Sequence, residues 1–342
     1  DHLIGFKVSP LVWRHAPPAK SAGRVQSPSL RIICERESER DKHQKEEYWP
    51  ISLKLNFEKF IFDADLIKIE ERDVKKEPLS SENEVKDVSK ELRSTTFIVK
   101  TIETKSQSSS PNPPFRTSTL QMTASSFLGF TADRTMRSAQ SLYEAGLITY
   151  LRTDGINIST SPNTGEPFSE ENPGPPPLEE IRNVIHQKYG KEFLSEKVRI
   201  YKSKVKNSQE AHEAIRPTNI QTFPENLNLG QDEQKLYSLI WNRTVSSQMS
   251  NAQYERKKII INSKDGKYLF NAASRKNIFE GFETLFSKNT SEEIKFPDSL
   301  KENVEVKLSE IISEQKFTLP PNRYSEASLI KKMEELGIGR PS

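Results

Sequence analysis

The stretch PPFRTSTLQMTASSFLGFTADRTMRSAQSLYEAGLITYLRTD, residues 113–154, decides the fold of this chain. Ser118 and Gln121 have the spacing of a capping box, which begins a helix. The apolar side chains expected on one face of that helix are Leu120, Ala124, Phe127 and Leu128. Gly129 suits the left-handed residue that ends a helix. A first helix is therefore predicted over 118–128.

A second helix is expected directly after the first one. Thr131 can cap its start and Gly146 can end it. Its apolar positions are Met136, Ala139 and Tyr143. Residues 147–153, LITYLRT, have the composition of a β-strand. Two helices joined by a short turn predict a helix-turn-helix unit that leads into this strand.

Strand patterns flank the helical stretch on both sides. β-branched and aromatic residues recur over 48–55, 57–69 and 95–102, and again over 256–262 and 303–308. The expected fold is therefore mixed α/β with several domains, in which a mainly helical insertion at 111–252 interrupts a β-rich module. The segments rich in charge, serine or proline, which are expected to be linkers or surface loops, are 70–94, 104–114 and 160–177.

Composition narrows the function classes only in part. The 342 residues can hold two or more domains, and the net charge of +3 neither indicates nor excludes a nucleic-acid groove. No apolar run approaches the roughly 20 residues of a membrane span, so no membrane insertion is expected. The single cysteine, Cys34, excludes an internal disulfide and is expected to be reduced and buried. One cysteine also offers no multi-Cys zinc site, so we expect an intracellular chain that is free of zinc over this span. Its first residues resemble no signal or transit peptide.

Tyr150 and Arg152 are the first candidates for chemistry. Side chains alternate along a strand, so Ile148, Tyr150 and Arg152 are predicted to share one face. A phenol is a poor nucleophile at neutral pH because its pKa is about 10. A neighbouring guanidinium favours the ionised phenol and can hold a phosphate oxygen. The plain alternative is ordinary packing and surface.

A second candidate lies in residues 207–217, NSQEAHEAIRP. Asn207 and Glu210 have capping-box spacing, and Pro217 is expected to end a helix of about two turns. The polar face of this helix carries Gln209, His212, Glu213 and Arg216, and its apolar face Ala211, Ala214 and Ile215. A histidine and an arginine one turn apart can bind phosphate and pass a proton, whereas the plain alternative is a solvated face.

Two further segments combine small residues with a cation. SAGRVQS, residues 21–27, predicts a turn whose backbone N–H groups can approach a phosphate. Ser325 is expected to cap a helix that ends at Gly337 and is followed by IGRPS, residues 338–342. The side chains of this helix expected to face inward are Leu329, Ile330, Met333 and Leu336.

Two patterns argue against other chemistry. The sequence has no Walker A segment, so no step driven by ATP is indicated. Asp63 and Asp65 have the spacing of a metal motif without its neighbouring acids, and we expect them on the surface.

Taken together, four segments in order resemble motifs of the type IA DNA topoisomerases, bacterial topoisomerase I in particular. They are 21–27, 113–154, 209–218 and 320–342. The resemblance implies a toroidal enzyme with a β-rich arch and helical domains, which relaxes negative supercoils without ATP. Such an enzyme cuts one DNA strand through a 5′-phosphotyrosine link, passes another strand through the gap and reseals the cut.

The resemblance also assigns roles to residues. Tyr150 would be the nucleophile, Arg152 would stabilise charge on the phosphorus oxygens, and His212 would contact DNA phosphate near the cut. The positions that would bind DNA are Ser21, Arg24, Gln26, Asp154, Arg340 and Ser342. The implied domains are 1–47 with 323–342, 48–110 with 253–322 as the arch, and 111–252 with the tyrosine.

The family's metal-binding TOPRIM domain is expected to precede Asp1, so Mg²⁺ would be held outside this chain. The chain alone is then expected to bind single-stranded DNA weakly and not to relax supercoils. Leu151 stands where topoisomerase III enzymes usually have proline, and Gly155 where the motif often has serine. The expected partner is a single-stranded segment of negatively supercoiled DNA, bound by a monomer in the bacterial cytoplasm or a eukaryotic organelle.

Two readings compete with this one. The chain could be a non-catalytic DNA-binding protein that uses the helix-turn-helix at 119–145, or a structural scaffold with a degenerate site. A groove reader needs base-contacting side chains on its second helix, where the sequence offers Arg134, Arg137, Gln140 and Ser141.

Overall fold

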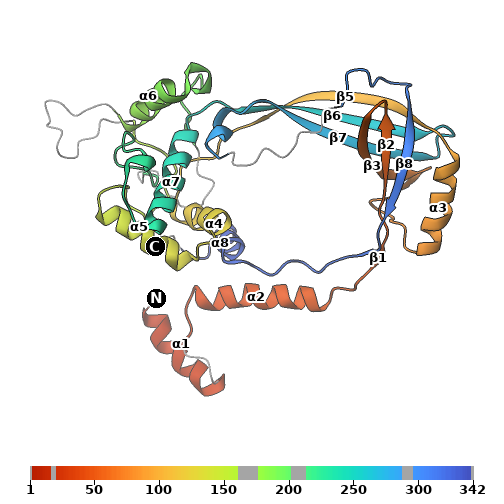
Figure 1. Cartoon of the computed structure of the whole chain (residues 1–342). Helices are drawn as coiled ribbons and strands as arrows, with labels where there is room; N and C mark the ends of the chain where they lie inside the picture. The colour runs from red at the N-terminus through yellow and green to blue at the C-terminus, as the bar shows by residue number, and fades with distance from the viewer. Residues whose placement is uncertain (1, 17–20, 161–175, 202–212, 287–295, 340–342) are drawn as a thin grey trace.

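The chain forms a ring in which a helical part and a β-barrel lie on opposite sides (Figure 1). The computed structural model describes residues 2–16, 21–160, 176–201, 213–286 and 296–339. The described helices are α1 (His2–His15), α2 (Gln26–Asp41), α3 (Glu82–Ser94), α4 (Thr117–Leu128), α5 (Ala132–Glu144), α6 (Pro177–Tyr189), α7 (Gln231–Ser246) and α8 (Glu326–Glu335), with 3₁₀ turns at Lys191–Phe193, Pro224–Asn226 and Gly281–Leu285. The strands are β1 (Glu47–Tyr48), β2 (Ile51–Phe57), β3 (Phe60–Ile69), β4 (Arg72–Asp73), β5 (Phe97–Ser109), β6 (Ala252–Ser263), β7 (Tyr268–Phe279), β8 (Glu305–Ser313) and β9 (Lys316–Phe317). The predicted mixed α/β ring is confirmed.

The barrel closes because β2 pairs with two neighbours. Its antiparallel order is β2-β8-β5-β6-β7-β3, and β2 also pairs with β3, while β4 extends from β3. Ile51, Leu53 and Leu55 alternate inward along β2 and are fully buried. Phe97 and Phe270 meet edge to face inside, with ring centroids 5.7 Å apart. Closure buries one apolar face and leaves the other face to solvent.

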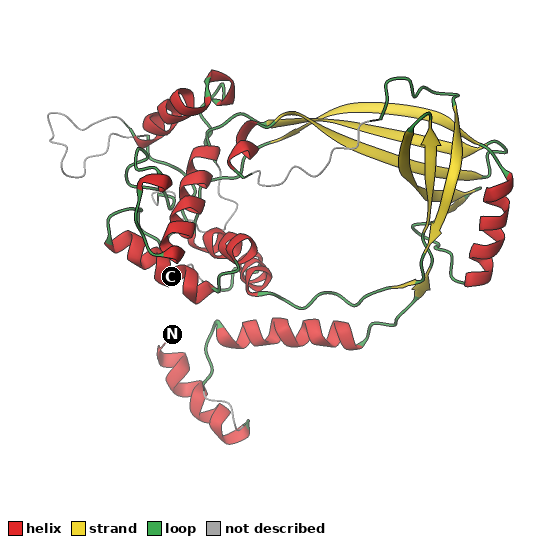
Figure 2. Cartoon of the chain, viewed as in Figure 1, coloured by secondary structure: helices red, strands yellow, loops and turns green. Residues whose placement is uncertain are grey.

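The strands β5, β6 and β7 are long enough to leave the barrel and reach the helical part (Figure 2). β5 pairs with β6 from Phe97↔Ser263 to Ser109↔Ala252. The linker predicted at 104–114 is therefore wrong over its first half, where the serine-rich sequence continues the strand. Exposed polar side chains are compatible with a three-stranded extension whose strands pair through their backbones.

The linker predicted at 70–94 is also wrong in its second half, which forms α3 at the end of the barrel (Figure 1). Ser81 caps this helix by accepting a hydrogen bond from the Glu84 backbone N–H at 3.3 Å. Val85, Val88 and Leu92 lie on one face and are buried in the barrel core. The charged residues between these three hide a helical period that the sequence contains.

The helical part has its own core, built by α4, α5, α6 and α7 with Trp241, Tyr237 and Leu120 fully buried. The helix-turn-helix is α4 and α5, joined at Gly129, whose φ is 67°. Phe282, although distant in sequence, also packs into this core.

The caps and faces of α4 and α5 differ partly from the prediction. The capping box of α4 uses Arg116 and Thr119 in place of Ser118 and Gln121, with the Arg116 N–H donating to Thr119 Oγ1 at 3.0 Å. Thr131 does cap α5, accepting from the Arg134 N–H at 3.1 Å. Phe127 and Tyr143 are exposed, so their predicted place on the apolar faces is wrong.

α8 closes the ring by packing against α4 (Figure 1). Ser325 caps α8 as predicted, accepting from the Ser328 N–H at 3.3 Å, but Leu336 is exposed rather than inward. Cys34, on α2, is exposed, so its predicted burial is wrong. Within the described ranges, every helix is too short or too polar to span a lipid bilayer.

Candidate active site

Residues 147–153 follow α5 as an irregular extended segment, and the predicted β-strand is wrong. Ile148 forms a single bridge to Pro217 and is buried, so it does not share a face with Tyr150. Tyr150 is 54% exposed and Arg152 is exposed, whereas Leu151 between them is buried. Tyr150 and Arg152 are therefore both exposed, but the strand that was to place them on one face is absent.

Two threonines fix this segment from behind. The Thr149 hydroxyl donates to the Ala214 carbonyl at 2.8 Å and accepts from the Arg216 N–H at 3.0 Å. The Thr153 hydroxyl donates to the Glu213 carbonyl at 2.9 Å. With Thr149, Leu151 and Thr153 turned inward, the residues between them are turned outward.

The N-terminus of α4 supplies a third anchor. The Thr117 hydroxyl donates to the Leu151 carbonyl at 2.7 Å and accepts from the Thr153 N–H at 2.9 Å. Thr117 is itself buried. Hydrogen bonds on both sides of Arg152 preorganise the backbone that carries the two candidate side chains.

The Tyr150 ring is held by one aromatic neighbour. Tyr143 on α5 contacts it edge to face, with ring centroids 5.5 Å apart and an interplanar angle of 68°. Among the described residues, the Tyr150 hydroxyl has no hydrogen-bond partner, and Arg152 has no ion pair. A phenol and a guanidinium thus face solvent with their polar atoms available to a ligand.

Three other tyrosines in the described ranges use their hydroxyls in hydrogen bonds within the protein. Burial raises the pKa of Tyr201, Tyr237 and Tyr268 to about 12. Their hydroxyls donate to the Ser247 carbonyl, the Thr222 carbonyl and the Glu91 carboxylate respectively. These phenols are structural and unsuited to attack a substrate.

Residues 213–217 are extended rather than helical, so the predicted helix is wrong where it is described. Ile215 bridges to Phe115, and Glu213 to Asn157. Arg216 is 5% exposed, and its guanidinium pairs with Glu213 at 2.8 Å. Arg216 also donates to the Pro217 carbonyl at 2.8 Å. Arg216 therefore braces the segment behind Tyr150 and does not face a substrate.

His212, the third predicted catalytic residue, lies outside the described residues, as do Arg340 and Ser342. Asp154 is described, is half-buried and takes part in an interaction of its own.

The N-terminal candidates lie where α2 begins. Ser21 donates to the Gln26 side chain at 3.2 Å, and Arg24 is exposed. Val25 lies within 4 Å of the position that a Cβ at Gly339 would take, and Ser29 donates to the Met333 sulfur at 3.3 Å. Residues 21–26 and the turn after α8 are thus brought together across the sequence.

Contacts of α8 with α4 and α5 connect this turn to the tyrosine segment. Glu334 accepts from Arg116 at 2.7 Å and from the Ser118 hydroxyl at 2.9 Å. Glu326 accepts from the Ala132 backbone N–H at 2.7 Å. Sequence reasoning missed Arg116, Thr117 and Glu334, because each acts through partners distant in sequence and carries no local motif.

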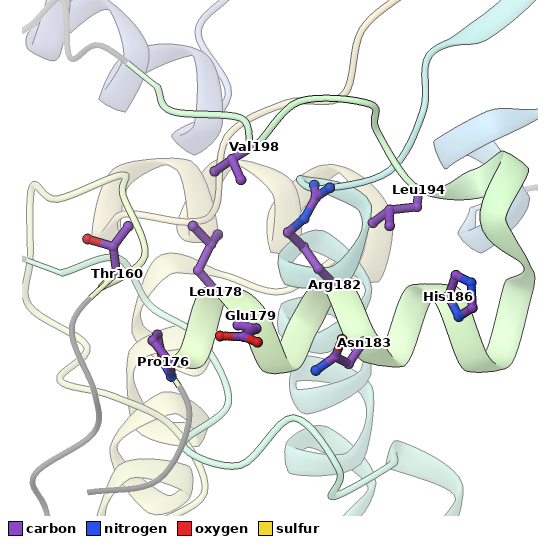
Figure 3. A pocket seen from close by; sticks show the side chains of 9 residues that line it. All are labelled: Thr160, Pro176, Leu178, Glu179, Arg182, Asn183, His186, Leu194 and Val198. Atoms are coloured by element: carbon purple, nitrogen blue, oxygen red, sulfur yellow. The ribbon is translucent and has the colours of Figure 1, made fainter.

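A pocket in the helical part does not contain the candidate residues (Figure 3). It has a volume of about 590 Å³ and lies between α6 and residues 194–198. Arg182 reaches across it to the Ser195 carbonyl at 2.9 Å, and burial lowers the pKa of Arg182. In the parts of the chain that are described, no group of three or more His, Cys, Asp or Glu could hold a metal ion.

Comparison of the sequence with known proteins identifies a family and several relatives. The model of a family described as DNA topoisomerase matches residues 1–342. DNA topoisomerase 1 of Rickettsia bellii is 46% identical over the whole chain, which spans 43% of that protein. DNA topoisomerase 1 of Helicobacter pylori is 39% identical over the whole chain, which spans 45% of it.

A solved structure gives the same result. Full-length topoisomerase I from Thermotoga maritima superposes with a TM-score of 0.79 and 35% identity, over 99% of this chain and 52% of that protein. The chain thus spans about half the length of the proteins it matches. The ordered motifs, the ring and these matches together show that the chain belongs to the type IA DNA topoisomerase family.

Proposed function

We propose that this chain carries the DNA-cleaving tyrosine of a type IA topoisomerase, and that Tyr150 is that residue. The observation that carries the proposal is the exposed Tyr150 phenol two residues from an exposed Arg152, which forms no ion pair with the described residues, on a segment held by Thr117, Thr149 and Thr153. Exposure gives a DNA strand access to the phenol oxygen. The threonine hydrogen bonds hold the backbone that carries both side chains.

The proposed reaction is a transesterification. The Tyr150 phenol loses its proton, its oxygen bonds the phosphorus, and the bond from phosphorus to the 3′ oxygen breaks as that oxygen takes up a proton. The DNA then remains attached through a 5′-phosphotyrosine ester. This ester retains the energy of the broken linkage, so attack by the 3′ hydroxyl reseals the strand without ATP.

In this proposal Arg152 binds the non-bridging phosphate oxygens. Charge accumulates on these oxygens in the transition state, and a preorganised guanidinium can donate two hydrogen bonds to them. His212 contacts a phosphate near the cut. The single strand reaches Tyr150 along Ser21, Arg24, Gln26, Asp154, Arg340 and Ser342.

Mg²⁺ is part of the family resemblance, but the described residues do not fit it, since they offer no cluster of three ligands. No step is therefore assigned to a metal. We propose that the partner is a single-stranded segment of negatively supercoiled DNA, bound by one copy of the protein inside the cell.

We also propose three domains, 1–47 with 323–342, 48–110 with 253–322, and 111–252. Two separate hydrophobic cores support the last two domains, one inside the barrel and one among α4–α7. Because Phe282 packs in the helical core, we assign the 3₁₀ turn Gly281–Leu285 to the tyrosine domain.

The alternative of a groove-reading helix-turn-helix is disfavoured by contacts of α5. Arg134 donates twice to Asp232, at 2.6 Å each. Arg137 pairs with Asp133 at 2.8 Å, and Gln140 donates to Glu144 at 2.7 Å. These side chains hydrogen-bond within the chain, so few polar groups of α5 are left to contact base edges.

The test is covalent trapping on a single-stranded oligonucleotide by this chain joined to the metal-binding domain that the family predicts. We expect a label at the 3′ end of the DNA to stay with the protein after denaturation, and a label at the 5′ end to be lost. Tyr150→Phe should abolish the adduct while DNA binding survives. Tyr143→Phe is the matched control, because it alters the neighbouring phenol and should retain the adduct.

Persistent adduct in Tyr150→Phe, or retention of the 5′ label, would overturn the proposal.

A further inference from the structure

A second surface with phosphate-binding chemistry lies on the outside of the β-barrel. A pocket of about 470 Å³ opens there over strands β3 to β7. The basic side chains that line it are Lys68, Lys75, Lys105, Arg256 and Lys258. It shares no residue with the proposed cleavage site.

Strand register explains why the cations gather. Directly opposite residues on antiparallel strands project from the same face, and Arg256 lies opposite Lys105 while Lys258 lies opposite Glu103. Ile259 and Ile261 alternate with these residues and are buried in the barrel, so Arg256 and Lys258 must project outward.

A β-bulge adds the other two cations. The pairing of β3 with β7 shifts register between Leu66 and Lys68, and a bulge re-aims the residues beside it. The chain then turns back, and the Val74 N–H donates to the Ile67 carbonyl at 3.1 Å. This turn brings Lys68 and Lys75 to the pocket together.

The two acids in the lining offset only part of its positive charge. Asp73 accepts from the backbone N–H of Lys75 at 2.9 Å, and Glu103 pairs with Lys105 at 3.0 Å. Among the described residues, Lys68, Lys75, Arg256 and Lys258 form no ion pair. Five cations minus two acids leave +3 in this one pocket, which equals the net charge of the whole chain.

Asn271 adds a neutral polar group that could contact a ligand in the pocket. It lines the pocket, and its Oδ1 is buried without a hydrogen-bond partner. A buried polar atom without a partner costs about 1–3 kcal/mol. Rotation of the carboxamide would turn Nδ2 toward an anionic oxygen, which accepts the hydrogen bond, and would place Oδ1 where it can accept from water.

We propose that this pocket binds the phosphodiester backbone of a nucleic-acid strand, as a contact additional to the cleavage site. The cations are spread over several strands rather than focused on one point, which suits successive phosphates better than a single small anion. The lining offers no aromatic ring on which a base could stack. The contact therefore recognises backbone and not sequence.

The test compares two pairs of substitutions in this chain, both made in Tyr150→Phe so that no cleavage occurs. Arg256→Gln with Lys258→Gln removes two charges from the pocket. Lys257→Gln with Lys276→Gln removes two charges from the opposite face of the same strands, since Lys257 alternates with the pocket residues and Lys276 lies opposite Glu255. Affinity for a labelled oligothymidylate is measured by fluorescence anisotropy over a salt series.

The pocket pair should weaken binding about tenfold at low salt and reduce the slope of log affinity against log salt by about 1.4, at about 0.7 per phosphate contact. The control pair should leave the slope unchanged, and Lys258→Arg should retain affinity. Equal effects of the two pairs would overturn the proposal, as would no effect of the pocket pair. Inorganic pyrophosphate is tested as a competitor against unlabelled oligothymidylate at the same phosphate concentration. If pyrophosphate displaces the labelled strand equally well, the pocket binds a small anion and the proposal is overturned.

These outcomes are independent of cleavage, because the adduct assay on Tyr150 can succeed or fail whichever result the anisotropy gives.

Discussion

Arg152 and Arg216 lie on two neighbouring segments joined by hydrogen bonds, yet they have opposite environments. Arg152 is exposed and has no ion pair among the described residues. Arg216 is buried, pairs with Glu213, and donates to a backbone carbonyl. Both belong to sequence motifs that predict phosphate contact, and only one is free to make it. The comparison teaches that a motif arginine acts on a ligand or on the fold according to the partners that tertiary structure gives it.

The largest effect is expected from Arg216→Ala. This change leaves the half-buried Glu213 carboxylate without its arginine partner, so we expect a loss of about 3 kcal/mol, the lower end of the range for a fully buried pair. Urea denaturation should show this loss in the free energy of unfolding. The double variant Arg216→Met with Glu213→Gln should recover much of the lost free energy of unfolding. An Arg216→Ala protein as stable as the parent would contradict the structural role of Arg216.

Arg152→Ala should affect the reaction and leave stability unchanged. A group that stabilises transition-state charge typically contributes a factor of about 10²–10³ in rate. Single-turnover cleavage of a labelled oligonucleotide should slow by that factor, while the free energy of unfolding stays within about 0.5 kcal/mol of the parent. Arg152→Lys keeps the charge and loses the paired donors, so its cleavage rate should lie between those of the parent and Arg152→Ala. Destabilisation comparable to that of Arg216→Ala would contradict a role toward ligand.

Thr149→Val tests the hydrogen bonds that join the two arginine segments. The Thr149 hydroxyl bonds both Ala214 and Arg216, and its removal leaves buried backbone groups without partners, at about 1–3 kcal/mol. We expect lower stability together with slower cleavage, because the Tyr150 segment loses an anchor. Thr149→Ser, which keeps the hydroxyl, should behave like the parent. Slower cleavage in Thr149→Ser as well would show that the methyl group, and not the hydrogen bonds, matters.

The smallest effect concerns a third arginine, Arg134, which is exposed but paired. Its hydrogen bonds lower the pKa of the Asp232 carboxyl. A lowered folded-state pKa means that the pair stabilises the fold above the unfolded pKa and that this contribution is lost as pH falls through the folded pKa. The difference in Tm between the parent and Asp232→Asn should therefore narrow on acidification. If the difference in Tm between the parent and Asp232→Asn widens at low pH, the prediction is contradicted.

Much of the fold could be predicted because local signals agreed with it. Gly129 and Thr131 set the turn of the helix-turn-helix as predicted, and the alternation in β3 placed Asp63 and Asp65 outside the barrel. The failures occurred where tertiary pairing overrides composition. α3 is so charged that its period of Val85, Val88 and Leu92 was missed, and the serine-rich end of β5 is a strand only because β6 lies beside it.

The candidate site could be predicted as a pair of residues but not as a structure. Tyr150 and Arg152 are both exposed, but the strand expected to place them on one face is an irregular segment. The helix expected around Arg216 is an extended stretch, because bridges to Phe115 and Asn157 satisfy its backbone instead. Thr117 could not be found from sequence, since its partners lie more than thirty residues away in the chain.

The most direct test is to identify the amino acid that becomes linked to DNA. The adduct formed on a single-stranded oligonucleotide is digested with nuclease and trypsin, and the modified peptide is sequenced by mass spectrometry. We expect a nucleotide joined through its 5′ phosphate to Tyr150 and none on Tyr143, whose ring contacts that of Tyr150. A modification on Tyr143 or on any other residue, with Tyr150 unmodified, would contradict it.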